Sequence, residues 1–447
     1  MKKHLWLPAY LLAAGLSNLP AFAADFTGLT PMGAEQAGNQ DGTIPAWTGG
    51  LPTDAASVDG KGFQANPFAG EKPLLVITAE NAEQYRERLS EGQRAMLRRY
   101  PETYRLPVYP THRTLALPQH MYDAAAANAK VVRLGADGLS IENFTNGHYP
   151  FPLPKTGTEV IWNHQTRYHG GNFRRWITQA TPQVNGQYTM VHLEEEAVEP
   201  SLAEGIDPQR ARNLLQLFKQ TVTAPARMAG NVLLVHETLD QVKEPRMAWV
   251  YNAGQRRVRR APQVAYDGPG TASDGLRTTD NHDMFNGAMD RYDWKLLGKR
   301  ELYIPYNSYE LDSPALKYSE ILKPGHINQD LARYELHRVW VVEASLREGQ
   351  RNIYAKRVFY VDEDSWQIAL SEHYDGRGQL WRVGEGHAKH YFNRQHTGYT
   401  LEALYDLLAG RYVALGMKNE EGRSMEYGFT ARVSDYTPSA LRKSGVR

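Results

Sequence analysis

Alternating apolar and polar positions, separated by short turn signals, dominate the chain after residue 155. The pattern predicts half-buried strands, among them 173–180, 187–194 and 232–239. Asn185-Gly186, between the first two, is typical of a two-residue hairpin turn. This regular spacing favours an antiparallel meander over βαβ units. Further strands are predicted at 159–162, 247–252, 255–260, 294–304, 334–344, 353–361, 368–374, 380–386 and 425–434.

Two long helices are predicted, at 79–99 and 207–219. The first follows an N-cap residue, Thr78, and ends before Pro101, because the residue before a proline avoids the helical conformation. The second has Asp207 as its N-cap and a proline at its first position. Shorter helices are predicted at 120–130 and 402–408.

The segment at 24–75 is rich in Gly, Pro and Asn and shows no sustained hydrophobic period. Such a composition predicts an extended arm rather than a helix or strand. We expect the aromatic side chains of Trp47, Phe63 and Phe68 to hold this arm against the body of the protein.

The first 23 residues have the three parts of a secretory signal peptide. Lys2 and Lys3 form the positive region, an apolar run follows at 5–16, and Ala21-Phe22-Ala23 is a small-x-small cleavage site. A retained membrane anchor is the alternative, but a spanning helix needs roughly 20 apolar residues. We therefore predict cleavage after Ala23 and a soluble periplasmic protein, and the absence of Cys excludes a lipid anchor.

Composition narrows the classes of partner. The chain has 51 basic and 50 acidic residues, so removal of Lys2 and Lys3 leaves 49 against 50. This balance argues against nucleic acid as the main partner. With no cysteine, the exported protein is held by its core alone, without disulfides. The 26 Tyr and 9 Trp suit surfaces that are apolar on one side and wet on the other.

Familiar catalytic motifs are absent from the sequence. It has no Cys nucleophile, no Gly-x-Ser-x-Gly turn, no phosphate-binding or dinucleotide glycine pattern and no His-Glu-x-x-His. These absences favour a non-catalytic protein without a cofactor. The three histidines at 387, 390 and 396 are a poor metal set, because His-x-x-His on a strand places its two side chains on opposite faces.

The loop at 267–293 is the most unusual segment, because it combines many Asp residues with Gly. Carboxylates in a glycine-rich loop can bind Ca²⁺, although the spacing does not match an EF-hand. Two other interpretations stay open: the residues cap turns, or the loop covers the mouth of a cavity. The acidic positions are Asp267, Asp274, Asp280, Asp283, Asp290 and Asp293.

The densest basic cluster lies just before this loop, at 256–260. On a strand Arg257 and Arg259 share one face, and a guanidinium turned inward needs a partner. The cluster either pairs with the acidic loop or holds a carboxylate or phosphate of an amphiphile. The candidate ligand-binding residues are Arg257, Arg259, Trp249, Tyr251 and Trp381.

Several motifs together resemble the DUF1329 family of Gram-negative periplasmic proteins, over nearly the whole exported chain. They are 30–35 (TPMGAE), 41–50 (DGTIPAWTGG), 249–251 (WVY), 256–262 (RRVRRAP), 359–362 (FYVD) with Trp366, and 374–381 (YDGRGQLW). The resemblance implies kinship with the lipoprotein-sorting proteins LolA and LolB. Those fold as an incomplete, strongly curved antiparallel barrel with helices in its mouth, and they carry acyl chains.

The family also implies a genetic association with an outer-membrane protein and with resistance-nodulation-division exporters. It has no established catalytic residues to carry over. We therefore expect a mainly β (α+β) fold: a signal peptide at 1–23, an arm and helical segment at 24–154, and a half-barrel at 155–447, covered by the helices at 79–99 and 207–219. The expected function is non-catalytic binding or shuttling of a hydrophobic or amphiphilic molecule between the two membranes. An adaptor for an exporter and an enzyme acting on a lipid or sterol-like substrate are the alternatives.

Overall fold

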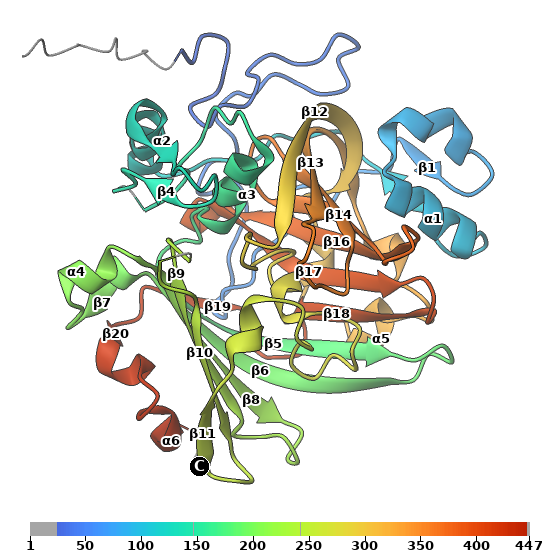
Figure 1. Cartoon of the computed structure of the whole chain (residues 1–447). Coiled ribbons are helices and arrows are strands. Elements are labelled where there is room, and N and C mark those ends of the chain that lie inside the picture. Colours follow the sequence, from blue (N-terminus) through green and yellow to red (C-terminus); the bar gives the residue numbers. More distant parts are fainter. Residues whose placement is uncertain (1–24, 146, 242, 445–447) are drawn as a thin grey trace, which may run out of the picture.

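The computed structural model describes residues 25–145, 147–241 and 243–444 of the chain. The predicted signal peptide lies outside these residues. Within them, no helix combines the length and the apolar character that crossing a bilayer requires. The protein is mainly β with a few short helices around one large sheet (Figure 1).

The large sheet consists of two antiparallel meanders that are joined where β18 pairs with β5. Within each meander, neighbouring strands of the sheet also follow one another in the sequence, when short strands outside the meander are left aside. One meander runs through β5 (Phe173–Pro182), β6 (Tyr188–Val198), β8 (Leu214–Ala224), β9 (Val232–Thr238), β10 (Met247–Asn252) and β11 (Arg257–Arg260). The other runs through β12 (Tyr292–Pro305), β13 (Tyr334–Leu346), β14 (Lys356–Asp362), β15 (Ile368–Tyr374), β16 (Leu380–Tyr391), β17 (His396–Asp406) and β18 (Arg411–Met417).

Short strands extend or flank this sheet. β1 (Leu75–Ile77) and β2 (Leu106–Val108) join it through a parallel bridge to β13, and β19 (Met425–Tyr427) pairs with β5. In Figure 1 β9–β11 run steeply relative to β16–β18, so the sheet twists strongly along its length. Two small separate sheets pair β3 (Arg133–Leu134) with β4 (Ile141–Glu142), and β7 (Ala203–Glu204) with β20 (Ala431–Arg432).

The helices are short. The α-helices are α1 (Glu91–Arg99), α2 (Gln119–Val131), α3 (Gly157–Gln165), α4 (Pro208–Ala211), α5 (Tyr318–Ile321) and α6 (Leu441–Ser444). The 3-10 helices are η1 (Ala82–Arg88), η2 (Pro200–Leu202), η3 (Pro262–Ala265), η4 (Thr279–Asn281), η5 (Glu310–Asp312), η6 (Gln329–Leu331), η7 (Phe392–Arg394) and η8 (Val433–Tyr436).

The hairpin predicted at Asn185-Gly186 is confirmed, because β5 and β6 pair across it and Gly186 has a φ of 84°. The strands predicted at 232–239, 247–252, 294–304, 334–344, 353–361, 368–374 and 380–386 are also confirmed, with shifts at their ends. The helix predicted at 120–130 corresponds to α2. Among the long strands, β8, β17 and β18 were missed, and the short strands β1, β2, β3, β4 and β7 were not predicted either.

The predicted helix at 79–99 is wrong as a single helix. It is split into η1 and α1 at Leu89, which adopts an extended conformation. Ser90 then starts α1 through a capping box. Its side chain accepts from the Gln93 N–H, and the Gln93 side chain accepts from the Ser90 N–H. A serine favours an N-cap over a helix interior, and this local preference ends the first helix.

The predicted helix at 207–219 is also wrong beyond its first turn. Asp207 does cap α4, by accepting from the Gln209 N–H, but α4 ends at Ala211 and β8 begins at Leu214. β8 pairs with both β6 and β9, and these ladders outweigh the local helical signal.

The opposite error occurs at 159–162, which was predicted as a strand. It lies inside α3, which Thr156 and Glu159 start with a capping box. The segment at 402–408 was predicted as a helix, but most of it belongs to β17, between β16 and β18. The strand predicted at 425–434 is in part correct, since it divides into β19 and β20.

The N-terminal arm packs on the body as predicted. The indole N–H of Trp47 donates to the Leu115 carbonyl, Phe63 is buried, and Phe68 stacks on His112 with ring centroids 4.3 Å apart. A further link is Trp366, whose indole N–H donates to the Met32 carbonyl at 3.2 Å and whose ring stacks on Trp340.

Trp366 is fully buried, so it provides a test of this packing. Replacement by alanine is expected to lower the free energy of unfolding by about 3–5 kcal/mol, because it removes a large buried side chain and leaves a cavity. Urea unfolding followed by tryptophan fluorescence and circular dichroism measures the change. Leu408→Ala, at a side chain 65% exposed, is the control and should change it by less than about 0.5 kcal/mol.

Candidate functional site

The segment at 261–291 crosses the large sheet, because it connects β11 at one edge with β12 at the opposite edge. It contacts strands of both meanders on its way. The Gln179 amide of β5 donates to the Thr271 and Ala272 carbonyls, and the Met284 N–H donates to Glu402 of β17 at 2.7 Å. This crossing loop contains most of the acidic loop identified in the sequence, and it forms one wall of the cavities described below.

An apolar pocket of about 460 Å³ lies between the two ends of the crossing loop, the helix α3 and the segment before β10. Its volume is in the range of sites for small organic ligands. Trp162, Ala265, Ala288 and Met289 in its wall are buried. The remaining lining residues are Leu139, Ser140, Leu239, Gln241, Pro245, Arg246, Pro262, Tyr266 and Asp290.

A smaller polar cavity, with a volume of about 80 Å³, lies farther along the same face of the sheet. A third hollow shares Glu237 and His282 with this cavity and Arg246 with the apolar pocket. The three hollows therefore form a series along the crossing loop. The charged and imidazole side chains around the polar cavity are His148, Arg167, His169, Arg175, Glu199, Glu237, His282, Asp283 and His396.

The charges at this cavity are arranged in pairs. Arg175 contacts Glu195 at 2.7 Å, Arg167 contacts Asp283, and Arg246 contacts Glu237. The neighbouring Arg167 guanidinium holds the pKa of Asp283 far below its usual value despite burial. The pairs leave little net charge, so the cavity offers hydrogen bonds rather than a strong field.

His164, directly beneath the crossing loop, is fixed in its neutral form. The Ile368 N–H donates to Nδ1 at 3.2 Å, so Nδ1 is an acceptor and Nε2–H donates to the Asp283 carbonyl at 2.9 Å. Burial, together with the nearby Arg167 charge, lowers the pKa of His164 to about 3. Burial likewise lowers the pKa of His282, at the polar cavity, to about 4.

The aspartates of the acidic loop do not converge on one point. Five of them each pair with a different arginine: Asp267 with Arg291, Asp274 with Arg411, Asp280 with Arg357, Asp283 with Arg167 and Asp293 with Arg347. The sixth, Asp290, accepts a hydrogen bond from the Tyr266 hydroxyl. Each carboxylate already has its own partner in a different direction. Of the three interpretations of this loop, the arrangement favours a cover over a cavity.

The candidate ligand-binding residues are not brought together. Arg257 and Arg259 are exposed on β11 at the edge of the sheet, and Tyr251 is buried in the core beneath that hairpin. Trp249 packs on His236, and the Arg260 guanidinium lies over the Trp249 ring. Trp381 lies on β16 and donates to Asp406. None of the five lines the three hollows, and the basic cluster forms no ion pair with the crossing loop among the described residues.

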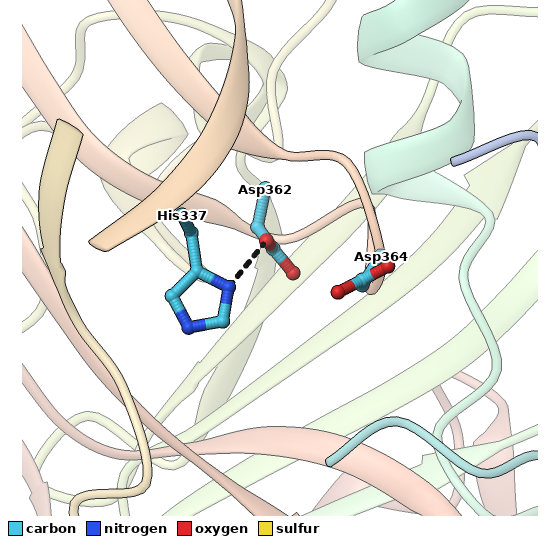
Figure 2. Close-up of side chains that lie close together, drawn as sticks. All are labelled: His337, Asp362 and Asp364. Carbon is cyan, nitrogen blue, oxygen red and sulfur yellow. Dashed lines mark ion pairs between the residues drawn. The ribbon is translucent and has the colours of Figure 1, made fainter. Parts of the chain in front are cut away.

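Sequence patterns also missed a buried cluster on the other meander. His337 of β13 faces Asp362 at the end of β14, and Asp364 follows in the turn before β15 (Figure 2). In the sequence, Asp362 stands out only as the last residue of the motif at 359–362. The partner histidine lies 25 residues earlier in the chain, and only the pairing of β13 with β14 brings it close.

A family model described as "Protein of unknown function (DUF1329)" matches residues 76–442. The chain belongs to the DUF1329 family. An uncharacterized protein of Pseudomonas aeruginosa is 62% identical over 421 residues, which cover 94% of this chain and 92% of that protein. This finding confirms the resemblance seen in the sequence.

Solved structures show weaker similarity. A candidate outer-membrane lipoprotein-sorting domain from Vibrio parahaemolyticus is 13% identical, with a TM-score of 0.43 over 62% of this chain and 93% of that one. A DUF1329 protein from Desulfovibrio piger has 14% identity and a TM-score of 0.40, over 60% and 91%. A LolA superfamily protein from Nitrosomonas europaea has 12% identity and a TM-score of 0.36, over 64% and 98%. Similarity of this degree does not establish a shared ligand or activity.

The neutral His164 makes a prediction for acid stability. Its pKa is about 3 in the folded chain and about 6.5 when unfolded, so the unfolded state binds the extra proton between these values. Stability therefore falls as the pH drops through this window, by about 1 kcal/mol per pH unit for each such histidine. His164→Gln should show a shallower fall than the unsubstituted protein in urea titrations between pH 6 and pH 4.

His120→Gln is the matched control, since His120 is exposed, and it should leave the slope unchanged. The comparison is between slopes, so a uniform loss of stability in the His164 variant does not affect it. An identical slope in the His164 variant would show that this side chain takes up protons equally in the folded and unfolded states, and would contradict the lowered pKa.

Proposed function

We propose that this protein binds a hydrophobic or amphiphilic molecule in the periplasm, with the apolar part of that molecule in the pocket beneath the crossing loop. The observation that carries the proposal is the apolar pocket of about 460 Å³. Concave, mostly apolar sites of this size with a few polar groups at the rim are the usual form of small-molecule sites.

Most polar groups of the pocket walls are already hydrogen-bonded, which favours an apolar occupant. Among the described lining residues, Gln241 Oε1 is the exception, since it is buried without a partner. The indole N–H of Trp162 donates to the Leu139 carbonyl, and that of Trp294, behind the wall, donates to the Met289 carbonyl. The Ala288 N–H donates to the Ala265 carbonyl and closes the wall between the two loop ends. An apolar ligand would therefore displace water without leaving these donors unpaired.

The neighbouring polar cavity suggests the character of the other end of the ligand. Its guanidinium groups are each matched by a carboxylate, so it suits a neutral or zwitterionic polar group better than a strong anion. The cavity is lined by strands of both meanders, including Arg175 of β5 and Tyr399 of β17. This lining supports our inference that the sheet curves around the site as a half-barrel. We further propose that the protein shuttles its ligand between the inner and outer membranes.

A variant that fills the pocket tests the proposal. Ala288→Trp places an indole in the wall and is expected to weaken binding of the hydrophobic fluorophore N-phenyl-1-naphthylamine by about tenfold or more, equivalent to about 1.4 kcal/mol. Fluorescence titration of the purified protein measures the change. The unsubstituted protein should bind saturably, with about one fluorophore per chain.

Leu408→Trp adds the same side chain at a position that is 65% exposed and should leave the affinity unchanged. Circular dichroism and thermal unfolding verify that both variants are folded. Native mass spectrometry of protein purified gently from its host should also detect a bound hydrophobic molecule. Apo protein throughout, together with equal fluorophore binding by the Ala288 variant, would refute the proposal.

A further inference from the structure

The cluster of His337, Asp362 and Asp364 lies in the interior, away from the proposed ligand pocket. The three residues are buried, with 1%, 1% and 2% of their surfaces exposed. One ligand atom from each lies within 4.8 Å of the others. Figure 2 shows Asp362 between His337 and Asp364, with its carboxylate directed at the imidazole.

The distance between His337 and Asp362 is unusual for a direct contact. His337 Nδ1 lies 3.7 Å from Asp362 Oδ1, which is longer than a hydrogen bond. Two donor atoms that bind one Zn²⁺ ion at about 2.1 Å are roughly 3.3–3.6 Å apart. The two atoms are therefore spaced as though they share a small cation.

Asp362 Oδ1 is buried and has no hydrogen-bond partner. The other oxygen, Oδ2, accepts from the Ser365 N–H at 2.9 Å and from the Ser365 hydroxyl at 2.6 Å. The serine therefore fixes the carboxylate with its free oxygen toward His337. A buried carboxylate oxygen without a partner is costly unless a cation or a proton compensates it.

The other carboxylates around this cluster each pair with an arginine or lysine, and Asp362 is the exception. Within the described residues, Glu335 pairs with Arg333, Asp364 with Arg113, and Glu363 with Lys299 and Arg338. Among the residues that the structure describes, His337 is the one basic group within ion-pair distance of Asp362. The site therefore has room, in electrostatic terms, for additional positive charge.

The surrounding groups are arranged as metal ligands usually require. His337 Nε2 lies 3.3 Å from Glu335 Oε2, and donation of its proton there leaves the Nδ1 lone pair facing Asp362. Arg113 holds both oxygens of Asp364, through Nε at 2.8 Å and a terminal nitrogen at 2.6 Å. Each of these oxygens keeps a second lone pair for a cation.

We propose that His337, Asp362 and Asp364 form a binding site for one divalent transition-metal ion, with Zn²⁺ the best match. A set of one imidazole nitrogen and two carboxylate oxygens suits Zn²⁺ better than Mg²⁺ or Ca²⁺, which take oxygen ligands. A small inward movement of Asp364 completes the set, and water takes the fourth position of a tetrahedral site.

The role of the ion is structural. Arg113, which holds Asp364, also donates to the carbonyls of Gln36 and Pro45 in the N-terminal arm. Glu363, between the two aspartates, accepts from the Glu35 N–H. A bound ion would therefore stabilise the junction between the arm and the sheet. This proposal does not depend on the ligand pocket or on the proposed function.

The test uses tag-free protein that has been treated with a chelator and dialysed. Isothermal titration with Zn²⁺ should show one site per chain, and the thermal midpoint should rise with Zn²⁺ concentration, because the ion binds only the folded state. Asp362→Asn should lower the affinity at least 100-fold. Glu335→Gln, which changes the partner of the imidazole, should lower it about 10–100-fold.

Asp293→Asn is the matched control: its side chain is 74% exposed, and the variant should bind Zn²⁺ as the unsubstituted protein does. Visible absorption of bound Co²⁺ gives a second readout, which reports nitrogen and oxygen ligation in unsubstituted protein even when the Asp362 variant is unstable. Absence of stoichiometric Zn²⁺ and Co²⁺ binding, or equal affinity in a folded Asp362 variant, would overturn the proposal. In that case His337 and Asp362 form an imidazolium–carboxylate pair.

Discussion

The position of two consecutive strands at opposite edges of one sheet is the constraint on which much of this structure depends. Because β11 and β12 are so placed, residues 261–291 must cross the sheet. A crossing segment without long helices brings many backbone N–H and C=O groups into the interior, where each needs a partner. The strands supply such partners: Gln179, Arg382 and Glu402 all bind backbone atoms of the loop.

The same constraint explains why so many charged side chains are buried. Arginines that reach the crossing loop, such as Arg167 and Arg357, are matched by Asp283 and Asp280 of the loop itself. Removing one partner would leave a buried charge unpaired, which costs far more than the net value of the pair. The apolar pocket lies between the two ends of the loop, and the pairs of Asp280 and Asp283 hold the part of the loop between those ends.

The sequence predicted elements well where the local pattern and the tertiary environment agree. The hairpin at Asn185-Gly186 is an example, because turn chemistry and the pairing of β5 with β6 favour the same conformation. Prediction failed where they compete. β8 begins just after a well-capped helical turn, and β17 has a helical composition at 402–408, but each is a central strand with a neighbour on both sides. α3 shows the reverse, because its capping box outweighs its strand-like apolar run.

By itself, the sequence determined the family, the mainly β composition, the balance of charge and the presence of an acidic loop, because these depend on residue types and short-range spacing. Tertiary structure alone decided the two sites. The apolar pocket joins α3 to both ends of the crossing loop, and His337 meets Asp362 only across the β13–β14 ladder. The basic cluster at 256–260 looked like the stronger candidate in the sequence, but it lies on an edge strand. Which side chains of distant segments meet depends on the order of the strands in the sheet, and local patterns do not encode that order.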